Sequence, residues 1–199
     1  YVAPYLGRMA DAGRPAHAET VEMHRLLEAV GARTKVLVAS VNPSLNGYSP
    51  EQTTNLYNDL LTKTRALPGV RNASLASDSP LSGGFDRYGI VVEGYTPQQG
   101  ERTGTDVTIV SPDYFKTLSL PLIAGRDFNE TDRVGSPHVA IVSDKMAKYF
   151  FGATNPLGRK IGLEKVPDIT IVGVVKDAQF VNLRDDVRRH FYLPASQEK

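Results

Sequence analysis

The sequence contains no cysteine, which excludes disulfide bonds, thiolate metal sites and cysteine nucleophiles. It also contains no run of about 18 apolar residues, the length that a membrane-spanning helix needs. The N-terminus lacks the basic segment, apolar core and small-residue cleavage site of a secretory signal. We therefore expect the chain as given to be soluble, although the absence of cysteine does not choose between cytoplasm and periplasm.

An excess of one charge is also missing, because 23 Lys and Arg residues oppose 22 Asp and Glu residues, for a net charge of +1. Residues 184–190 form the most basic stretch, but Asp185 and Asp186 interrupt it. This composition is typical of a solvated loop rather than of a track for phosphates. We therefore expect no nucleic-acid partner.

Motifs for catalysis, metal binding and nucleotide binding are absent as well. No phosphate-binding glycine motif and no Gly-x-Ser-x-Gly elbow occurs, and the acidic segment 127–132 lacks the spacing of a calcium loop. No two histidines share the short helical spacing of a zinc site; they are His17, His24, His138 and His190. We expect no metal, no cofactor, no catalytic residue and no enzymatic activity. A hydrolase built on His138, a serine and an acid is the weakest alternative.

A chain of 199 residues with 41% hydrophobic residues can form one sizeable domain or two small lobes. In the first half, residues 36–41 are apolar and β-branched and predict a buried strand. Ser49 predicts the start of a helix, because Pro50 suits its first position and Gln52 completes a capping box. Residues 67–69 end this helix and residues 70–76 predict a second strand, so the segment is expected to be a β-helix-β unit whose helix packs on a sheet.

The second half predicts more strands than helices. Residues 77–88 are expected to be a long exposed loop. Strands are predicted at 89–95 and 106–110, which form an antiparallel hairpin, and at 160–163, 169–175 and 190–193, with 169–175 as a central strand. The interleaving favours an α+β fold with split β-α-β units, an inserted mixed β lobe, and mostly antiparallel or mixed sheets.

A weak internal repeat joins residues 108–111 to residues 140–143. Each copy is a short apolar strand that ends at a serine, Ser111 or Ser143, placed to cap the helix that follows. The second of these helices is predicted at residues 144–150. The repeat reflects either a true duplication or the common local pattern in which a strand is followed by a capping residue and a helix.

Four short motifs follow one another in the second half: Ser-Pro-Asp-Tyr-Phe at 111–115, Ala-Gly-Arg-Asp-Phe at 124–128, Asn-Pro-Leu-Gly at 155–158 and Ile-Val-Gly-Val-Val at 171–175. Their chemistry predicts structure rather than catalysis. Gly125 permits a tight turn, Arg126 pairs with a nearby carboxylate and Phe128 packs on the domain. In the third motif proline and glycine shape a turn that Leu157 anchors in the core. Gly173 marks a bulge or a close backbone approach, or serves packing alone. The proposed structural signature is Gly125, Arg126, Asp127, Phe128, Asn155, Pro156, Gly158 and Gly173.

In this order and spacing, the motifs resemble the periplasmic core domain of ABC-type permeases related to the macrolide exporter MacB and to FtsX, particularly the duplicated permeases common in acidobacteria. The resemblance covers residues 36–194 and brings no catalytic positions with it. Residues 1–35, which include a helical pattern at 17–30, are expected to be a separate N-terminal segment. The segment continues a membrane helix, packs on the domain, or is foreign to it. Residues 36–199 then form the core domain, as one body or two lobes.

The resemblance implies a fragment of an inner-membrane protein that faces the periplasm. Its implied work is to couple ATPase-driven motion of membrane helices to export or release of a substrate. The implied partners are membrane helices of the same full-length chain, a cytoplasmic ABC ATPase acting indirectly, a periplasmic or outer-membrane protein, and a second copy in a homodimer. An alternative is direct binding of a small molecule, peptide or lipid by the loop that contains Ser82, Gly83, Tyr88 and Tyr95, where tyrosines offer amphipathic contacts.

Overall fold

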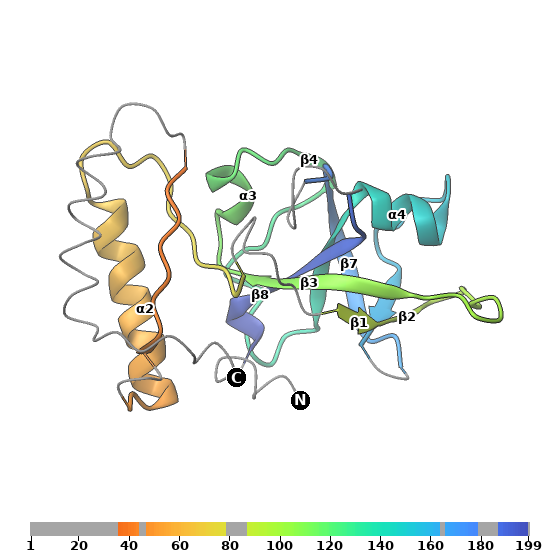
Figure 1. Cartoon of the computed structure of the whole chain (residues 1–199), viewed down its shortest axis with the longest axis horizontal. Coiled ribbons are helices and arrows are strands. Elements are labelled where there is room, and N and C mark those ends of the chain that lie inside the picture. The colour runs from red at the N-terminus through yellow and green to blue at the C-terminus, as the bar shows by residue number, and fades with distance from the viewer. Residues whose placement is uncertain (1–35, 44–46, 79–86, 164–165, 179–186, 199) are drawn as a thin grey trace. The chain divides into compact units, whose positions relative to one another are not determined.

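The computed structural model describes residues 36–43, 47–78, 87–163, 166–178 and 187–198 (Figure 1). The chain divides into two compact units, Tyr1–Ala73 and Ser74–Lys199, and each is considered by itself. The helical pattern predicted at 17–30 lies outside the described residues, so the boundary at residue 35 stays a prediction.

Helix α2 (Pro50–Arg65) is the helix described in the first unit, and its start is as predicted. The Gln52 backbone N–H donates to Ser49 Oγ at 3.2 Å, and the Ser49 backbone N–H donates to Gln52 Oε1 at 2.8 Å. These two bonds form the capping box and satisfy donors that the first turn of a helix leaves open. The helix ends at Ala66, and Gly69 follows with a φ of 86°.

The predicted β-helix-β unit is wrong. Residues 36–41 form no strand, and Leu37 and Val38 are 42% and 53% exposed. Residues 70–75 also form no strand, and Ala76 makes a single bridge to Val110. Val41 is held instead by the Tyr57 hydroxyl, which donates to its carbonyl oxygen at 3.0 Å. β-branched composition shows that a segment would fit a pleated surface. It does not by itself make a strand where the described part of the unit supplies no partner strand.

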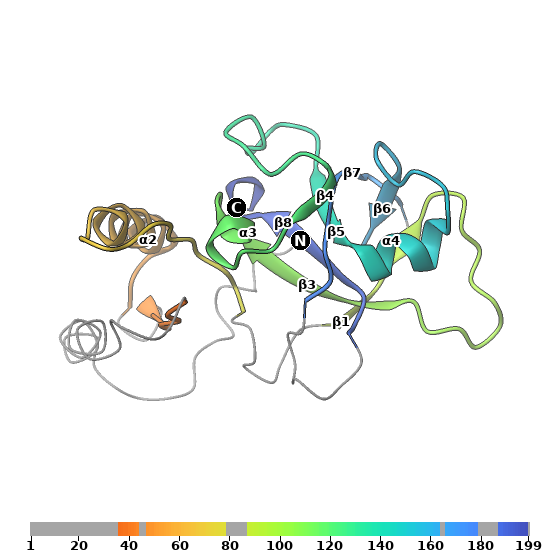
Figure 2. The same ribbon diagram turned by 90° about the horizontal axis from the view of Figure 1, so that it is seen from above.

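The second unit contains one mixed sheet of eight strands in the order β1-β3-β8-β5-β7-β6-β2, with β4 also paired to β7 (Figures 1 and 2). Pairs β3–β8 and β5–β7 are parallel and the other pairs are antiparallel. The strands are β1 (Arg87–Gly89), β2 (Val91–Val92), β3 (Gly104–Val110), β4 (Leu122–Gly125), β5 (Val139–Ser143), β6 (Lys160–Gly162), β7 (Ile169–Val175) and β8 (His190–Pro194). The α+β class with a mixed sheet is therefore confirmed.

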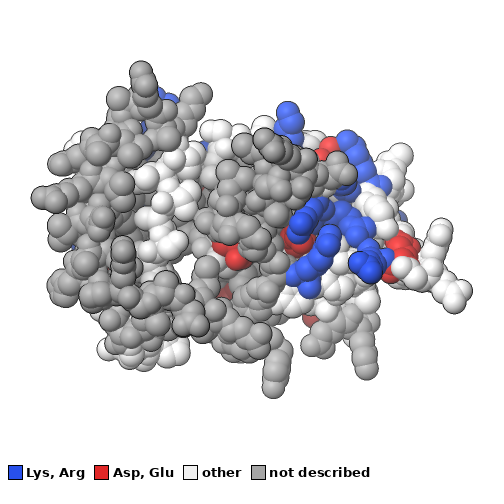
Figure 3. Space-filling view, in the orientation of Figure 1, with Lys and Arg blue, Asp and Glu red and all other residues white. Residues whose placement is uncertain are grey.

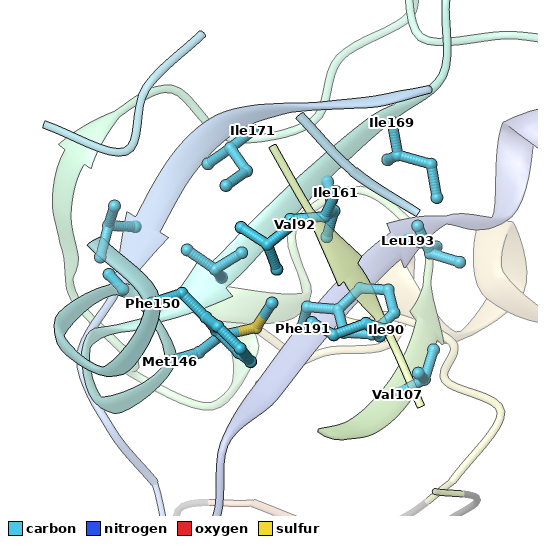
Figure 4. Packing of buried hydrophobic residues seen from close by; sticks show 14 residues of the cluster. Ile90, Val92, Val107, Met146, Phe150, Ile161, Ile169, Ile171, Phe191 and Leu193 are labelled. Atoms are coloured by element: carbon cyan, nitrogen blue, oxygen red, sulfur yellow. The ribbon is translucent and has the colours of Figure 1, made fainter. Parts of the chain in front are cut away.

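The unit's β-α-β element is β5–α4–β7, whose two strands are direct neighbours rather than separated by another strand. Helix α4 (Asp144–Phe151) begins as predicted, because Ser143 Oγ accepts from the Met146 backbone N–H at 3.2 Å. It packs against β5, β7 and β8 (Figure 2). Figure 4 shows Met146 and Phe150 pointing from α4 toward Phe191 on β8.

The other face of the sheet carries a second apolar cluster, because neighbouring residues of a strand point to opposite faces. We refer to the buried residues packed around Met146, Phe150 and Phe191 as the α4 cluster. Tyr192, the next residue of β8, packs instead with Tyr114 and Phe115 of the short helix α3 (Tyr114–Thr117). The ring centroids of Phe115 and Tyr192 lie 4.9 Å apart, edge to face. A 3-10 turn, η2 (Ala195–Gln197), follows β8.

Two further predictions need correction. Of the predicted hairpin, only the antiparallel pairing of β1 with β3 is present. The chain leaves this pairing at Ile90, and β2 pairs with β6 instead. Ser111 does not cap a helix: the N-cap of α3 is Asp113, whose side chain makes no capping hydrogen bond, and Ser111 Oγ accepts from the Leu75 backbone N–H at 2.8 Å. The serine oxygen therefore accepts from a passing extended segment in one copy of the repeat and from a helix N-terminus in the other.

Candidate functional site at a junction on strand β7

Two of the signature turns converge on the middle of strand β7. Gly125, at the end of β4, pairs with Gly173, and the Arg126 backbone N–H donates to the Val172 carbonyl at 2.9 Å. The Gly158 backbone N–H donates to the Ile171 carbonyl, also at 2.9 Å. We refer to the contacts of residues 125–126 and 158–159 with residues 171–173 as the β7 junction. Short motifs far apart in the sequence thus meet on one strand.

Two of the three glycines at the junction, Gly125 and Gly173, are required by close backbone contacts. A Cβ atom on Gly125 would lie 2.2 Å from the Val172 carbonyl oxygen, and this glycine also has a φ of 75°. A Cβ atom on Gly173 would lie 2.5 Å from the Arg126 carbonyl oxygen. The register of β5 against β7 shifts at the same place, from Ala140–Ile171 to Ile141–Gly173. Gly173 therefore lies at both a bulge and a close backbone approach.

Arg126 pairs with a carboxylate, as predicted, and the partner is Asp132. Arg126 Nη1 and Nη2 donate to the two carboxylate oxygens at 2.7 Å each. The Asn129 backbone N–H donates to the same carboxylate at 2.9 Å. Because these donors favour the ionised form, led by the guanidinium of Arg126, the pKa of Asp132 is lowered although its side chain is buried. The acidic segment is thus a structural ion pair, and no group of acidic or histidine residues in the described part of the chain is arranged to hold a metal.

The neighbouring signature residues serve packing and turn geometry. Phe128 is buried, as predicted, and lies near Phe115. Its backbone N–H donates to the Asp127 carboxylate at 2.7 Å. Asn155 Oδ1 accepts from the Leu157 backbone N–H at 3.1 Å, and Leu157 packs against the α4 cluster. Pro156 precedes Leu157, and its carbonyl accepts from the Arg159 backbone N–H at 3.1 Å, while Gly158 has a φ of 80°. The junction therefore fixes the relative positions of three segments and presents no reactive group.

The predicted ligand loop is only partly described, because Ser82 and Gly83 lie outside the described residues. Tyr88, on β1, is half-buried against the α4 cluster. Tyr95 follows β2; its hydroxyl donates to Glu101 and its ring meets Phe150 edge to face, with centroids 5.1 Å apart. The hydrogen bond to Glu101 raises the pKa of Tyr95. Tyr95 thus supports its own loop, and ligand contact by this region stays a prediction.

Sequence reasoning missed a buried polar group on β3 and β8. Asp106 is 1% exposed, faces Arg87 across the β1–β3 pair and also lies near Arg188. Burial raises the pKa of Asp106 against the opposing effect of the arginines. His190, beside it on β8, is buried with Nε2 2.8 Å from Thr108 Oγ1, and burial lowers its pKa to about 3. The alternation of residues 104–110 is the one signal that places Asp106 and Thr108 on a common face.

The arrangement near His138 gives no support to a hydrolase. His138 is exposed, and its carbonyl oxygen accepts from the Thr170 backbone N–H at 2.9 Å. The buried His190 has its Nε2 2.8 Å from Thr108 Oγ1.

The chain matches the family of the MacB-like periplasmic core domain over residues 20–198. It belongs to this family. The match begins inside residues 1–35 and extends to the end of the sheet, so the resemblance seen in the motifs is confirmed. No helix in the described parts of the chain is both long and apolar enough to span a membrane.

Two curated relatives are similar to parts of the chain. The uncharacterized ABC transporter permease YknZ of Bacillus subtilis (strain 168) is 36% identical over 76 residues, which cover 38% of this chain and 19% of that protein. The pyoverdine export ATP-binding/permease protein PvdT of Pseudomonas aeruginosa is 29% identical over 157 residues, which cover 76% of this chain and 21% of that protein. The chain thus spans about a fifth of the length of these relatives.

A solved structure shares the fold. The periplasmic region of MacB from Actinobacillus actinomycetemcomitans superposes with a TM-score of 0.50 and 20% sequence identity, covering 70% of this chain and 55% of that one. The mixed sheet with few helices is therefore the fold of this family.

Proposed function

We propose that this chain is a non-catalytic extracytoplasmic domain of an ABC-type permease. In this role it couples ATPase-driven motion of membrane helices to the export or release of a substrate. The family match over residues 20–198 is the observation that carries the proposal. The names of the relatives, a permease and an ATP-binding/permease protein, support the same role.

The geometry of the β7 junction supports mechanical work. Its hydrogen bonds join backbone to backbone, and Gly125 and Gly173 leave no space for a side chain between β4 and β7. Because tightly packed backbones cannot deform continuously, a displacement of either turn is passed to the centre of the sheet. The bidentate Arg126–Asp132 pair holds the first of these turns in place.

The proposed setting is the inner membrane, with this domain in the periplasm. The proposed partners are membrane helices of the same full-length chain and, through them, a cytoplasmic ABC ATPase. A periplasmic or outer-membrane protein and a second copy of the permease complete the proposed assembly. These partners follow from the role of the whole transporter, of which the chain is a part.

A distance measurement in the full-length transporter tests the coupling. Because this chain has no native cysteine, spin labels can be placed at Asn55→Cys in the first unit and Lys145→Cys in the second, both at exposed helical positions. We expect the distance distribution between these labels to change between the nucleotide-free state and the ATP-bound state of a hydrolysis-deficient complex. A control pair at Lys145→Cys and Ile123→Cys, both within the second unit, should stay constant. Unchanged distributions for the first pair would contradict the coupling role.

A further inference from the structure

Arginine side chains from two separate segments gather at one end of the sheet. Arg87 opens the edge strand β1, and Arg188 and Arg189 directly precede β8. Arg87 Nε lies 3.6 Å and Arg188 Nη1 lies 3.8 Å from the carboxylate of Asp106. Figure 3 shows Lys and Arg side chains gathered right of centre, where β1, β3 and α4 lie in Figure 1.

Arg87 and Arg188 retain hydrogen-bonding capacity. Neither is within hydrogen-bond distance of Asp106, and neither oxygen of this buried carboxylate has a hydrogen-bond partner among the described residues. The side chains of Arg87 and Arg188 are 53% and 39% exposed. Asp106 therefore attracts the guanidinium groups by charge and, as far as the described residues show, leaves their N–H donors for an external acceptor.

The surroundings hold this site in a defined shape. Arg189 Nη2 donates to the carbonyl oxygens of Arg102 and Gly104 at 2.6 Å and 3.1 Å, and its guanidinium lies 4.0 Å from the centre of the Tyr149 ring. Arg87 lies over Gly104, where a Cβ atom would come within 3.2 Å of its Cδ. The absence of a side chain on Gly104 thus makes room for Arg87 beside Arg189.

Among the described strands, β1 lies at the end of the sheet order and pairs with β3 on one side. An outer edge of this kind can accept another strand, with main-chain bonds giving affinity and side-chain contacts giving specificity. We propose that the β1 edge, with Arg87 and Arg188, is a docking surface for an extended acidic peptide segment of a partner protein. The bound segment adds as a strand beside β1, and its carboxylates take the free guanidinium donors.

The observations favour a peptide over a phosphate or a lipid headgroup. The buried Asp106 lies beneath both arginines and repels a doubly charged phosphate more strongly than a single carboxylate. The chain's net charge of +1 gives no long-range attraction to an anionic membrane. A sheet edge also needs a backbone to pair with, which only a polypeptide supplies. The surface lies outside the β7 junction, so this inference does not depend on the coupling role.

Binding of defined probes to the full chain tests the inference. The probe is a fluorescent peptide that alternates glutamate with threonine; the comparison probes are its lysine counterpart, an N-methylated copy that cannot pair its backbone, and phosphatidylglycerol vesicles. We expect saturable binding of the glutamate peptide alone. Equal binding of the lysine peptide or of the N-methylated copy would overturn the proposal, as would preferential binding of the vesicles.

Variants of the arginines provide the second part of the test. Arg87→Ala with Arg188→Ala should weaken peptide binding by about tenfold or more, because hydrogen bonds to charged groups are lost. Adding Asp106→Asn removes the buried charge that these changes leave unpaired, so the triple variant keeps the fold and should bind equally weakly. Arg133→Ala, at an exposed arginine of another loop, is the matched control and should bind as the wild type does. Wild-type affinity in the triple variant would overturn the proposal.

Discussion

His190 is expected to make the stability of the second unit sensitive to mild acid. The side chain is 2% exposed, its ring stacks on Tyr192 with centroids 4.6 Å apart, and Nε2 lies 2.8 Å from Thr108 Oγ1. Burial lowers its pKa from 6.5 to about 3. Since the unfolded chain binds the proton first, the free energy of unfolding falls as the pH drops below the unfolded value and continues to fall until the folded pKa is reached.

The magnitude follows from the two pKa values. Between about pH 7 and about pH 5 the unfolded histidine becomes largely protonated while His190 in the folded state does not, which costs about 2 kcal/mol of stability. Asp106 acts in the opposite sense, because its raised pKa lets the folded state take up a proton before the unfolded state does. The effect of His190 must therefore be measured as a difference between the wild type and His190→Gln.

Urea unfolding followed by circular dichroism at both pH values gives this difference. We expect the wild type to lose about 2 kcal/mol more than His190→Gln over this range. If His190→Gln and the wild type lose the same stability, His190 is protonated as easily in the folded state as in the unfolded state, and the reasoning from burial is refuted.

Three further substitutions test the β7 junction and its surroundings by the same unfolding assay. Gly173→Ala should cost about 2 kcal/mol or more, because the new Cβ meets a carbonyl oxygen at 2.5 Å, whereas Gly89→Ala, whose Cβ would lie 4.0 Å from Thr103 Oγ1, should cost far less. Asp132→Asn should cost about 1–2 kcal/mol, a loss that shrinks in acid as the pH falls through the lowered pKa of the carboxyl group. Lys148→Ala, at an exposed pair, should cost clearly less. Ser143→Ala should cost about 2 kcal/mol, because its Oγ accepts from two buried backbone N–H groups. Equal losses in a variant and its control, or an unaffected Ser143→Ala, would contradict these contacts.

Sequence patterns within a few residues correctly predicted the elements that depend on contacts between those same residues. The start of α2 follows from a capping box within four residues, and the start of α4 follows from the Ser143 cap. Strand β7 has the predicted bounds because its β-branched run is flanked on both sides by other strands. In these cases the chemistry of a short segment and its place in the fold agree.

Elements that depend on distant partners were not predictable in the same way. Residues 36–41 have strand composition without a strand partner in their unit, and Ser111 serves Leu75 rather than the helix that follows it. The junction motifs were correctly interpreted as turns, but their meeting on β7 depends on the strand order, which one sequence does not encode locally. The cluster around Asp106 likewise joins β1 and β3 to β8, which lies far from both of them in the chain.

The most direct test of the account is the side of the membrane on which the domain lies. In the full-length protein, Lys145→Cys provides one exposed thiol within this chain, and a cysteine-free background elsewhere makes its labelling specific. We predict that a maleimide unable to cross the inner membrane labels this residue in intact cells as fully as after that membrane is permeabilised. Labelling that requires permeabilisation would place the domain in the cytoplasm and contradict its role as the extracytoplasmic part of a permease.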